Sequence, residues 1–360
     1  MNLPRNAQLW LPGYLRGLAR RRPTPPARVW LMIADHFEPL GQTANKRAAD
    51  ERAARERTAR WRWEWPAIAR RHADSIGRQP AYTFFYPEEE YRPALLDPLA
   101  ELADAGVADV EIHLHHDGEG ERNFVGRIRR FKEILFARHG LLRKSKNEIV
   151  FGFIHGNWAL DNSRPDGRWC GLNNEISLLR DLGCYADFTL PSAPSAAQTR
   201  LVNTIYWALD DPQKPKSHDT GIPLCAAEDS SGDLLMIPGP LALDWRRRKY
   251  GILPRLETGE LAAGNPVSRE RVRLWLQCAP RIGADQFIKL FAHGARERNA
   301  RQLLGGDLDL VFRLLREECA KQASALRYAT AWEMHNAVRA AHLPSRRESA
   351  LAAVASMARG

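Results

Sequence analysis

Short apolar runs alternate with longer amphipathic stretches along most of this 360-residue chain, and this alternation strongly constrains its fold. Residues 29–34 form a continuous apolar run, which is typical of a strand buried on both faces of a parallel sheet. Strands that alternate with helices predict such a sheet. Seven or eight strand–helix units favour closure over an open sheet. We therefore expect an α/β fold, a distorted (β/α)7-8 barrel with parallel strands.

The expected elements follow from hydrophobic periodicity and from turn and cap residues. The predicted strands are residues 29–34, 81–86, 109–115, 148–155, 185–190, 234–237, 286–291 and 326–329. The predicted helices are residues 43–71, 93–105, 121–138, 172–182, 268–277, 308–320 and 330–341. The expected organisation is a basic N-terminal arm (1–28), the barrel (29–342) with an irregular insertion around 210–265, and a flexible C-terminal tail (343–360).

The formal net charge of +10 raises the question of a nucleic-acid partner. Basic residues mostly alternate with acids, as in residues 50–57, and no zinc-finger spacing or RNA-binding aromatic signature occurs. We therefore expect solvated helix faces and no nucleic-acid partner. The sequence does not reveal the oligomeric state.

Cysteine usage and hydropathy bear on location. The five cysteines are scattered and odd in number, which favours reduced thiols and a cytoplasmic protein. No signal-peptide core and no transmembrane segment is evident. Residues 10–22 could form a short basic amphipathic helix, so a peripheral membrane contact through the arm stays open.

Metal-type ligands are concentrated in residues 110–117, which read VEIHLHHD. Because side chains alternate along a strand, Glu111, His113 and His115 share one face, and Asp117 could continue it. His116 falls on the apolar side. Imidazole and carboxylate together suit Zn²⁺ or a similar divalent ion, so a metal-dependent enzyme is the leading hypothesis.

Further polar residues follow other predicted strands. Asp35 and His36 come directly after residues 29–34, His155 ends the strand at 148–155, and His293 follows the strand at 286–291. Barrel enzymes build their sites at the carboxyl ends of their strands. These side chains are therefore expected to lie around one site.

The order of these residues resembles the polysaccharide deacetylase (NodB-homology) family, as a divergent branch of the glycoside hydrolase/deacetylase barrel superfamily. The resemblance rests on Ala34-Asp35-His36-Phe37, on Glu111-Ile112-His113-Leu114-His115, on His155-Gly156-Asn157-Trp158, on Asp187 in a later strand, and on Leu290-Phe291-Ala292-His293-Gly294. It departs from the family at Glu119, where a second histidine is usual. Asp117, Glu119, His113 or His116 could supply the missing ligand.

The resemblance implies a hydrolase that acts on a carbon–nitrogen bond other than a peptide bond and uses a divalent metal, with Zn²⁺ favoured. Its substrate would be an N-acetylated sugar of a polysaccharide or its precursor. Asp35 would be the general base and His293 the acid that protonates the leaving amine, with a carboxylate such as Asp187 orienting His293. The implied metal ligands are His36, His115 and Asp117, with His113 and His116 as possible additional ones. The implied substrate contacts are His155, Asn157, Trp158 and Asp187.

Two other functions stay open at this point. A glycoside hydrolase on the related barrel would use two carboxylates about 5–10 Å apart, such as Asp35 with Asp117 or Asp187. A non-catalytic glycan-binding or assembly protein would have kept the barrel and lost the reaction. His113 could also be a hydrogen-bonded barrel residue, and Trp158 could serve core packing.

Overall fold

The computed structural model describes residues 3–19, 24–41, 48–225 and 230–343. Its strands are β1 (Arg28–His36), β2 (Tyr82–Pro87), β3 (Ala108–Leu114), β4 (Arg143–Ser145), β5 (Glu148–His155), β6 (Cys184–Asp187), β7 (Tyr206–Ala208), β8 (Gly221–Pro223), β9 (Leu234–Met236), β10 (Ala242–Lys249), β11 (Leu253–Glu257), β12 (Glu260–Leu261), β13 (Arg281–Ile282), β14 (Asp285–Ala292) and β15 (Ala325–Tyr328). Its α-helices are α1 (Ala7–Ala19), α2 (Ala48–Ala69), α3 (Pro93–Asp104), α4 (Glu121–His139), α5 (Glu175–Asp181), α6 (Arg269–Cys278), α7 (Glu297–Gln302), α8 (Leu308–Lys321) and α9 (Ala331–His342).

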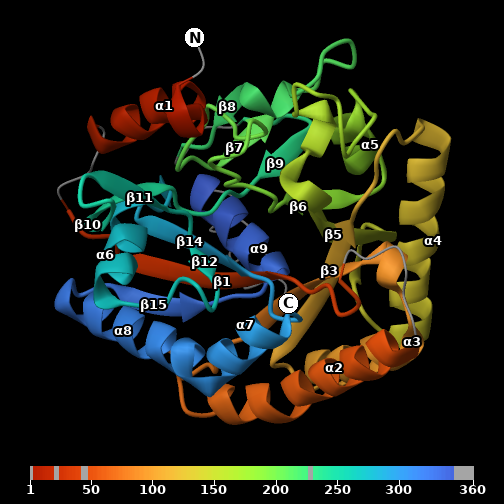
Figure 1. The fold of residues 1–360 in the computed structure, drawn as a ribbon, viewed down its shortest axis with the longest axis horizontal. Helices are drawn as coiled ribbons and strands as arrows, with labels where there is room; N and C mark the ends of the chain where they lie inside the picture. Colours follow the sequence, from red (N-terminus) through yellow and green to blue (C-terminus); the bar gives the residue numbers. More distant parts are fainter. Residues whose placement is uncertain (1–2, 20–23, 42–47, 226–229, 344–360) are drawn as a thin grey trace, which may run out of the picture.

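One mostly parallel sheet forms the centre of the described structure, and helices such as α2, α4 and α8 lie along its outside (Figure 1). The strand order is β12-β14-β1-β2-β3-β5-β6-β9-β7-β8, and β15 pairs with the first half of β1. The pairs from β12 through to β9 are parallel, which confirms the predicted α/β class. Strand pairing does not join β12 to β8 within the described residues, so the closed barrel stays a prediction.

Each of the eight predicted strands corresponds to a strand of this sheet. Every residue of β14 is buried and β1 is buried over its last six residues, as a parallel strand covered on both faces should be. The irregular insertion contains antiparallel pairing, with β7 next to β8 and β9 and a separate β10–β11 hairpin. The start of the predicted helix 43–71 and nearly all of the predicted C-terminal tail lie outside the described residues.

The N-terminal arm contains α1, and this helix packs on the rest of the protein. Trp10 and Tyr14 are buried in a cluster with Ala193, Val202 and Leu241. These two aromatic side chains are therefore not available to a membrane surface. None of the described helices is both long and apolar enough to cross a membrane.

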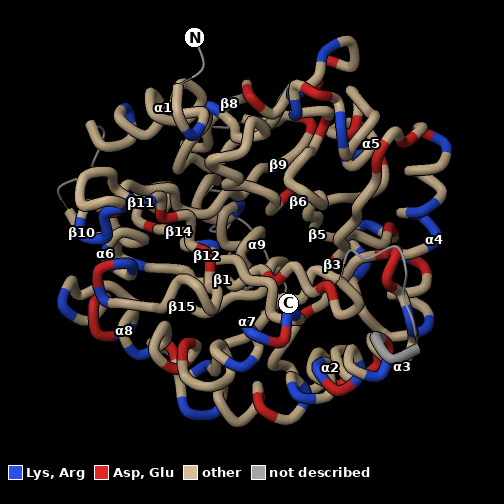
Figure 2. Tube along the Cα trace, viewed as in Figure 1, with Lys and Arg blue, Asp and Glu red and all other residues tan. Residues whose placement is uncertain are grey.

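Charged residues of both signs lie along the outer helices. Figure 2 shows Lys and Arg interspersed with Asp and Glu on α2, α4 and α8. Several form pairs one helical turn apart, such as Arg55 with Glu51 and Arg313 with Glu317. This mixture is typical of solvated helix faces, and the absence of a nucleic-acid partner stays a prediction.

A buried ion pair holds α6 against the end of β11. The Arg271 guanidinium donates to both Glu257 carboxylate oxygens at 2.6 and 3.0 Å, and neither side chain is exposed. The Trp275 indole N–H donates to the same carboxylate at 2.8 Å.

We predict that Glu257→Ala lowers the free energy of unfolding by about 3–5 kcal/mol, because it leaves the Arg271 charge buried without its partner. Urea denaturation measures this loss. Arg301→Ala, which breaks an exposed pair with Glu297, is the control and should leave stability almost unchanged. An equally small effect for both variants would contradict the prediction.

Candidate metal centre

Histidines from three strands meet at the carboxyl edge of the sheet. His36 ends β1, His113 lies in β3 with His115 just beyond it, and His293 follows β14. The ring of His36 lies 5.1 Å from that of His113 and 4.9 Å from that of His293, between centroids. The rings of His113 and His115 are 4.5 Å apart. The predicted convergence of His36, His115 and His293 is thus present in the structure.

Glu38 lies between these histidines and is 4 % exposed. Its Oε1 atom is 3.4 Å from Nε2 of His113 and 3.4 Å from Nε2 of His115. Ligand atoms of His36, Glu38 and His113 all lie within 4.8 Å of one another, so this group could hold a metal ion. Burial disfavours the charged carboxylate, but the neighbouring His113 and His115 rings outweigh burial and hold the pKa of Glu38 well below its usual value.

In His113 and His115, the ring nitrogen Nδ1 faces a hydrogen-bond acceptor outside the centre. Nδ1 of His113 lies 2.8 Å from the carbonyl oxygen of Ile154, and Nδ1 of His115 lies 2.5 Å from Oε1 of Glu89. A carbonyl or carboxylate oxygen only accepts, so each Nδ1 carries the donated proton. Both Nε2 atoms then face Glu38. Metal-binding histidines are usually oriented in this way, and the donor set fits a zinc-type ion.

Burial keeps two other histidines neutral. It lowers the pKa of His36 well below the usual value and lowers the pKa of His293 to about 4. Burial also acts to lower the pKa of His115, but the Glu38 and Glu89 carboxylates outweigh it and raise this pKa to about 9. Without a bound cation, His115 is therefore protonated at neutral pH.

Two glycines make room for this arrangement. A Cβ atom on Gly294 would lie 2.1 Å from Oδ2 of Asp35 and 2.6 Å from the Trp61 ring. A Cβ atom on Gly156 would lie 2.2 Å from the His115 ring. The His-Gly pairs at 155–156 and 293–294 thus have a packing reason, since no side chain fits at either glycine.

Three predicted carboxylates lie elsewhere, so the structure corrects their expected placement. Asp35 points to the opposite face of β1 from His36 and accepts hydrogen bonds from Gly294 N–H and the Tyr82 hydroxyl. Strand β3 ends at Leu114, so the alternation of side chains does not continue to Asp117. Its carboxylate accepts a hydrogen bond from the Trp169 N–H instead. Asp187 accepts from the N–H and hydroxyl of Thr189 rather than orienting His293. Glu119 pairs with Arg127 and also stays outside the centre.

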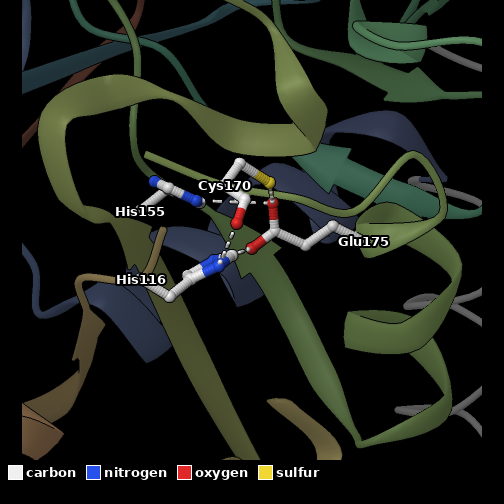
Figure 3. A group of neighbouring side chains, drawn as sticks. All are labelled: His116, His155, Cys170 and Glu175. Atoms are coloured by element: carbon white, nitrogen blue, oxygen red, sulfur yellow. Dashed lines mark hydrogen bonds and ion pairs between the residues drawn. The ribbon is translucent and has the colours of Figure 1, made fainter. Parts of the chain in front are cut away.

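Two more predicted residues, His116 and His155, belong to a separate buried group with Cys170 and Glu175 (Figure 3). His155 is completely buried within this group, so its predicted contact with a substrate stays a prediction. Four residues of these two groups were not predicted from the sequence: Glu38, Glu89, Cys170 and Glu175. Glu38 follows His36 by two residues and shares its face if strand geometry continues, which was the available signal.

Trp158 lies beside the centre and is partly exposed. Its ring centroid is 6.2 Å from that of His36 and 6.3 Å from that of His293. Asn157 and Trp158 both adopt positive φ angles, 55° and 57°. Such a conformation is unusual for a bulky residue and is often retained at functional sites. The predicted placement of Trp158 at the site agrees with this geometry.

Comparison with known protein families and with curated proteins gives no match for this chain. The family resemblance therefore rests on its own residues.

We predict that His113→Ala lowers the metal content of zinc-loaded protein by about one ion per chain, because the centre loses one of the three donors that lie within 4.8 Å of one another. Elemental analysis of the purified variant measures this loss. His335→Ala, on α9, is the matched control and should keep the wild-type content. Unchanged metal in His113→Ala would rule out this centre as the binding site.

The pKa of His115 predicts that metal affinity rises with pH. Below about pH 9 His115 is protonated when no metal is bound, so metal binding must release that proton. Release of this one proton lowers the metal affinity by about tenfold for each unit that the pH falls below 9. Zinc titrations between pH 6 and 9 test this. Glu89→Gln removes one cause of the raised pKa and should flatten the dependence. Affinity that does not change with pH would contradict the prediction.

Proposed function

We propose that this protein is a divalent-metal-dependent hydrolase that removes acetyl groups from an N-acetylated sugar of a polysaccharide or its precursor. The observation that carries the proposal is the meeting of His36, Glu38, His113 and His115 at the carboxyl ends of neighbouring strands. The resemblance to polysaccharide deacetylases supplies the substrate class.

His36, Glu38 and His113 would hold the metal, with His115 as a further donor. When bound, a divalent ion polarises a carbonyl group and makes water a better nucleophile at neutral pH. The buried setting strengthens both effects, because few water dipoles compete for the charge.

His293 is the best-placed residue to move a proton. Burial lowers its pKa to about 4, so its imidazole is neutral at neutral pH but is a weaker base than an ordinary histidine, and it would take a proton only from a water that a bound cation makes more acidic. The imidazolium that results can then protonate the leaving amine. Asp35 accepts hydrogen bonds from the Gly294 N–H and the Tyr82 hydroxyl, so we assign it to positioning Gly294 next to His293.

The sugar would lie against Trp158, whose ring is beside both His36 and His293. Aromatic faces offer sugars an apolar surface, and the neighbouring Asn157 carries an amide suited to hydroxyl groups. This placement supports a carbohydrate over a substrate that lacks such a face.

The carboxylates favour a metal centre over a two-carboxylate glycoside hydrolase. Such an enzyme needs two carboxyl groups that flank one bond. Here Glu38 and Glu89 both bind His115, while Asp35, Asp117 and Asp187 have other partners. A non-catalytic glycan-binding protein is the second candidate, because the partly exposed Trp158 would serve it equally well.

Acetate release from N-acetylated oligosaccharides tests the proposal. Zinc-loaded protein should release acetate and chelator-treated protein should not. His293→Ala should lower kcat by about 10²–10⁴-fold while it keeps the metal, and His335→Ala should behave as wild type. New reducing ends without acetate would identify a glycoside hydrolase. Binding without turnover would identify a glycan-binding protein.

A further inference from the structure

A second group of metal-type donors lies outside the centre described above. His116 comes from just beyond β3, His155 from the end of β5, Cys170 from the following loop, and Glu175 from the start of α5. Figure 3 shows the four side chains converging from these segments. All four are buried, and their ligand atoms lie within 4.8 Å of one another.

The spacing of these donors fits a four-coordinate ion. Glu175 Oε1 is 3.0 Å from Nε2 of His116. Glu175 Oε2 is 3.3 Å from Sγ of Cys170 and 3.5 Å from Nε2 of His155. Ligands about 2.1 Å from a tetrahedral zinc ion are themselves about 3.4 Å apart. The Glu175 Oε2 atom lies at about this separation from the Cys170 and His155 donors, while His116 approaches the other oxygen of the same carboxylate.

The protonation pattern leaves His155 with an unsatisfied acceptor. Its Nδ1 lies 2.5 Å from the carbonyl oxygen of Gly156 and so donates to it. Its Nε2 is fully buried and makes no hydrogen bond, although it faces the Glu175 carboxylate. Two hydrogen-bond acceptors that face each other in a water-free interior destabilise the fold unless a cation lies between them.

The ring of His116, like that of His155, has its Nδ1 atom against a carbonyl oxygen and its Nε2 atom toward Glu175. Its Nδ1 lies 3.2 Å from the carbonyl oxygen of Cys170, which directs Nε2 at Glu175. The main-chain N–H of Asp161 donates to Glu175 at 2.7 Å and fixes the carboxylate. Three of the donors are thus held in place by outside hydrogen bonds, as the ligands of a metal usually are.

We propose that His116, His155, Cys170 and Glu175 form a second metal site, a closed four-coordinate zinc site. A thiolate with two imidazoles selects zinc over magnesium or calcium, which prefer oxygen ligands. The site has four protein donors and is buried, so it leaves no open position for a substrate. Its role is structural: it joins the ends of β3 and β5 to the loop that follows Trp158 and to α5.

This inference does not rest on the proposed function, because it holds even if the first centre catalyses no reaction. The two sites also separate by experiment. His113→Ala removes a donor of the first centre only, and Cys170→Ser removes a donor of the second only. Cys319→Ser, at another buried cysteine, is the matched control.

Cobalt substitution tests the proposal through the thiolate. Wild-type protein loaded with Co²⁺ should show a near-ultraviolet absorption band from thiolate-to-cobalt charge transfer. His113→Ala and Cys319→Ser should keep this band. Cys170→Ser should lose it, and its zinc content should fall from about two ions per chain to about one. A wild-type protein without the band, or a Cys170→Ser variant that keeps it, would overturn the proposal.

X-ray absorption spectroscopy of zinc in the wild-type protein tests the proposal without any substitution, so misfolding of a variant cannot affect the result. We expect a sulfur neighbour at about 2.3 Å for half of the bound zinc. Zinc surrounded by nitrogen and oxygen alone would overturn the proposal, even if the first centre is full and active.

Discussion

The buried Asp35 carboxylate fixes the edge of the sheet on which the metal centre depends. It accepts hydrogen bonds from Gly294 N–H at 2.7 Å and from the Tyr82 hydroxyl at 2.8 Å, which links β1 to β2 and to the residues after β14. Strand alternation then turns His36 to the opposite face, toward the other histidines. Burial raises the pKa of Asp35 to about 7, because the charged carboxylate is removed from water.

The two donor groups differ in ways that follow from their surroundings. The centre around Glu38 has partly exposed neighbours, Trp158 and the Glu89 side chain. The group around Glu175 is closed and includes a thiol. The ends of β3 and β5 contribute to both groups. His115 and His116, just after β3, are adjacent in sequence and point to different groups. In β5, the Ile154 carbonyl oxygen contacts His113 of the first group, and His155 belongs to the second. One short segment thus contributes to two donor groups of different composition.

Strand positions and the placement of histidines at strand ends could be predicted from the sequence, because both follow from local periodicity. The roles of Asp117 and Asp187 could not, since each depends on how the chain turns after its strand ends. Glu175 was unpredictable for a different reason: its partners come from distant segments. Closure of the sheet is equally non-local, and apolar runs alone could not distinguish a closed barrel from an open arrangement.

Anomalous diffraction at the zinc absorption edge, from crystals of the zinc-loaded protein, tests the central claim most directly. The account predicts a peak between the Glu38 carboxylate and the rings of His36 and His113. Density that shows these side chains hydrogen-bonded to one another, with no anomalous peak after zinc loading, would contradict it.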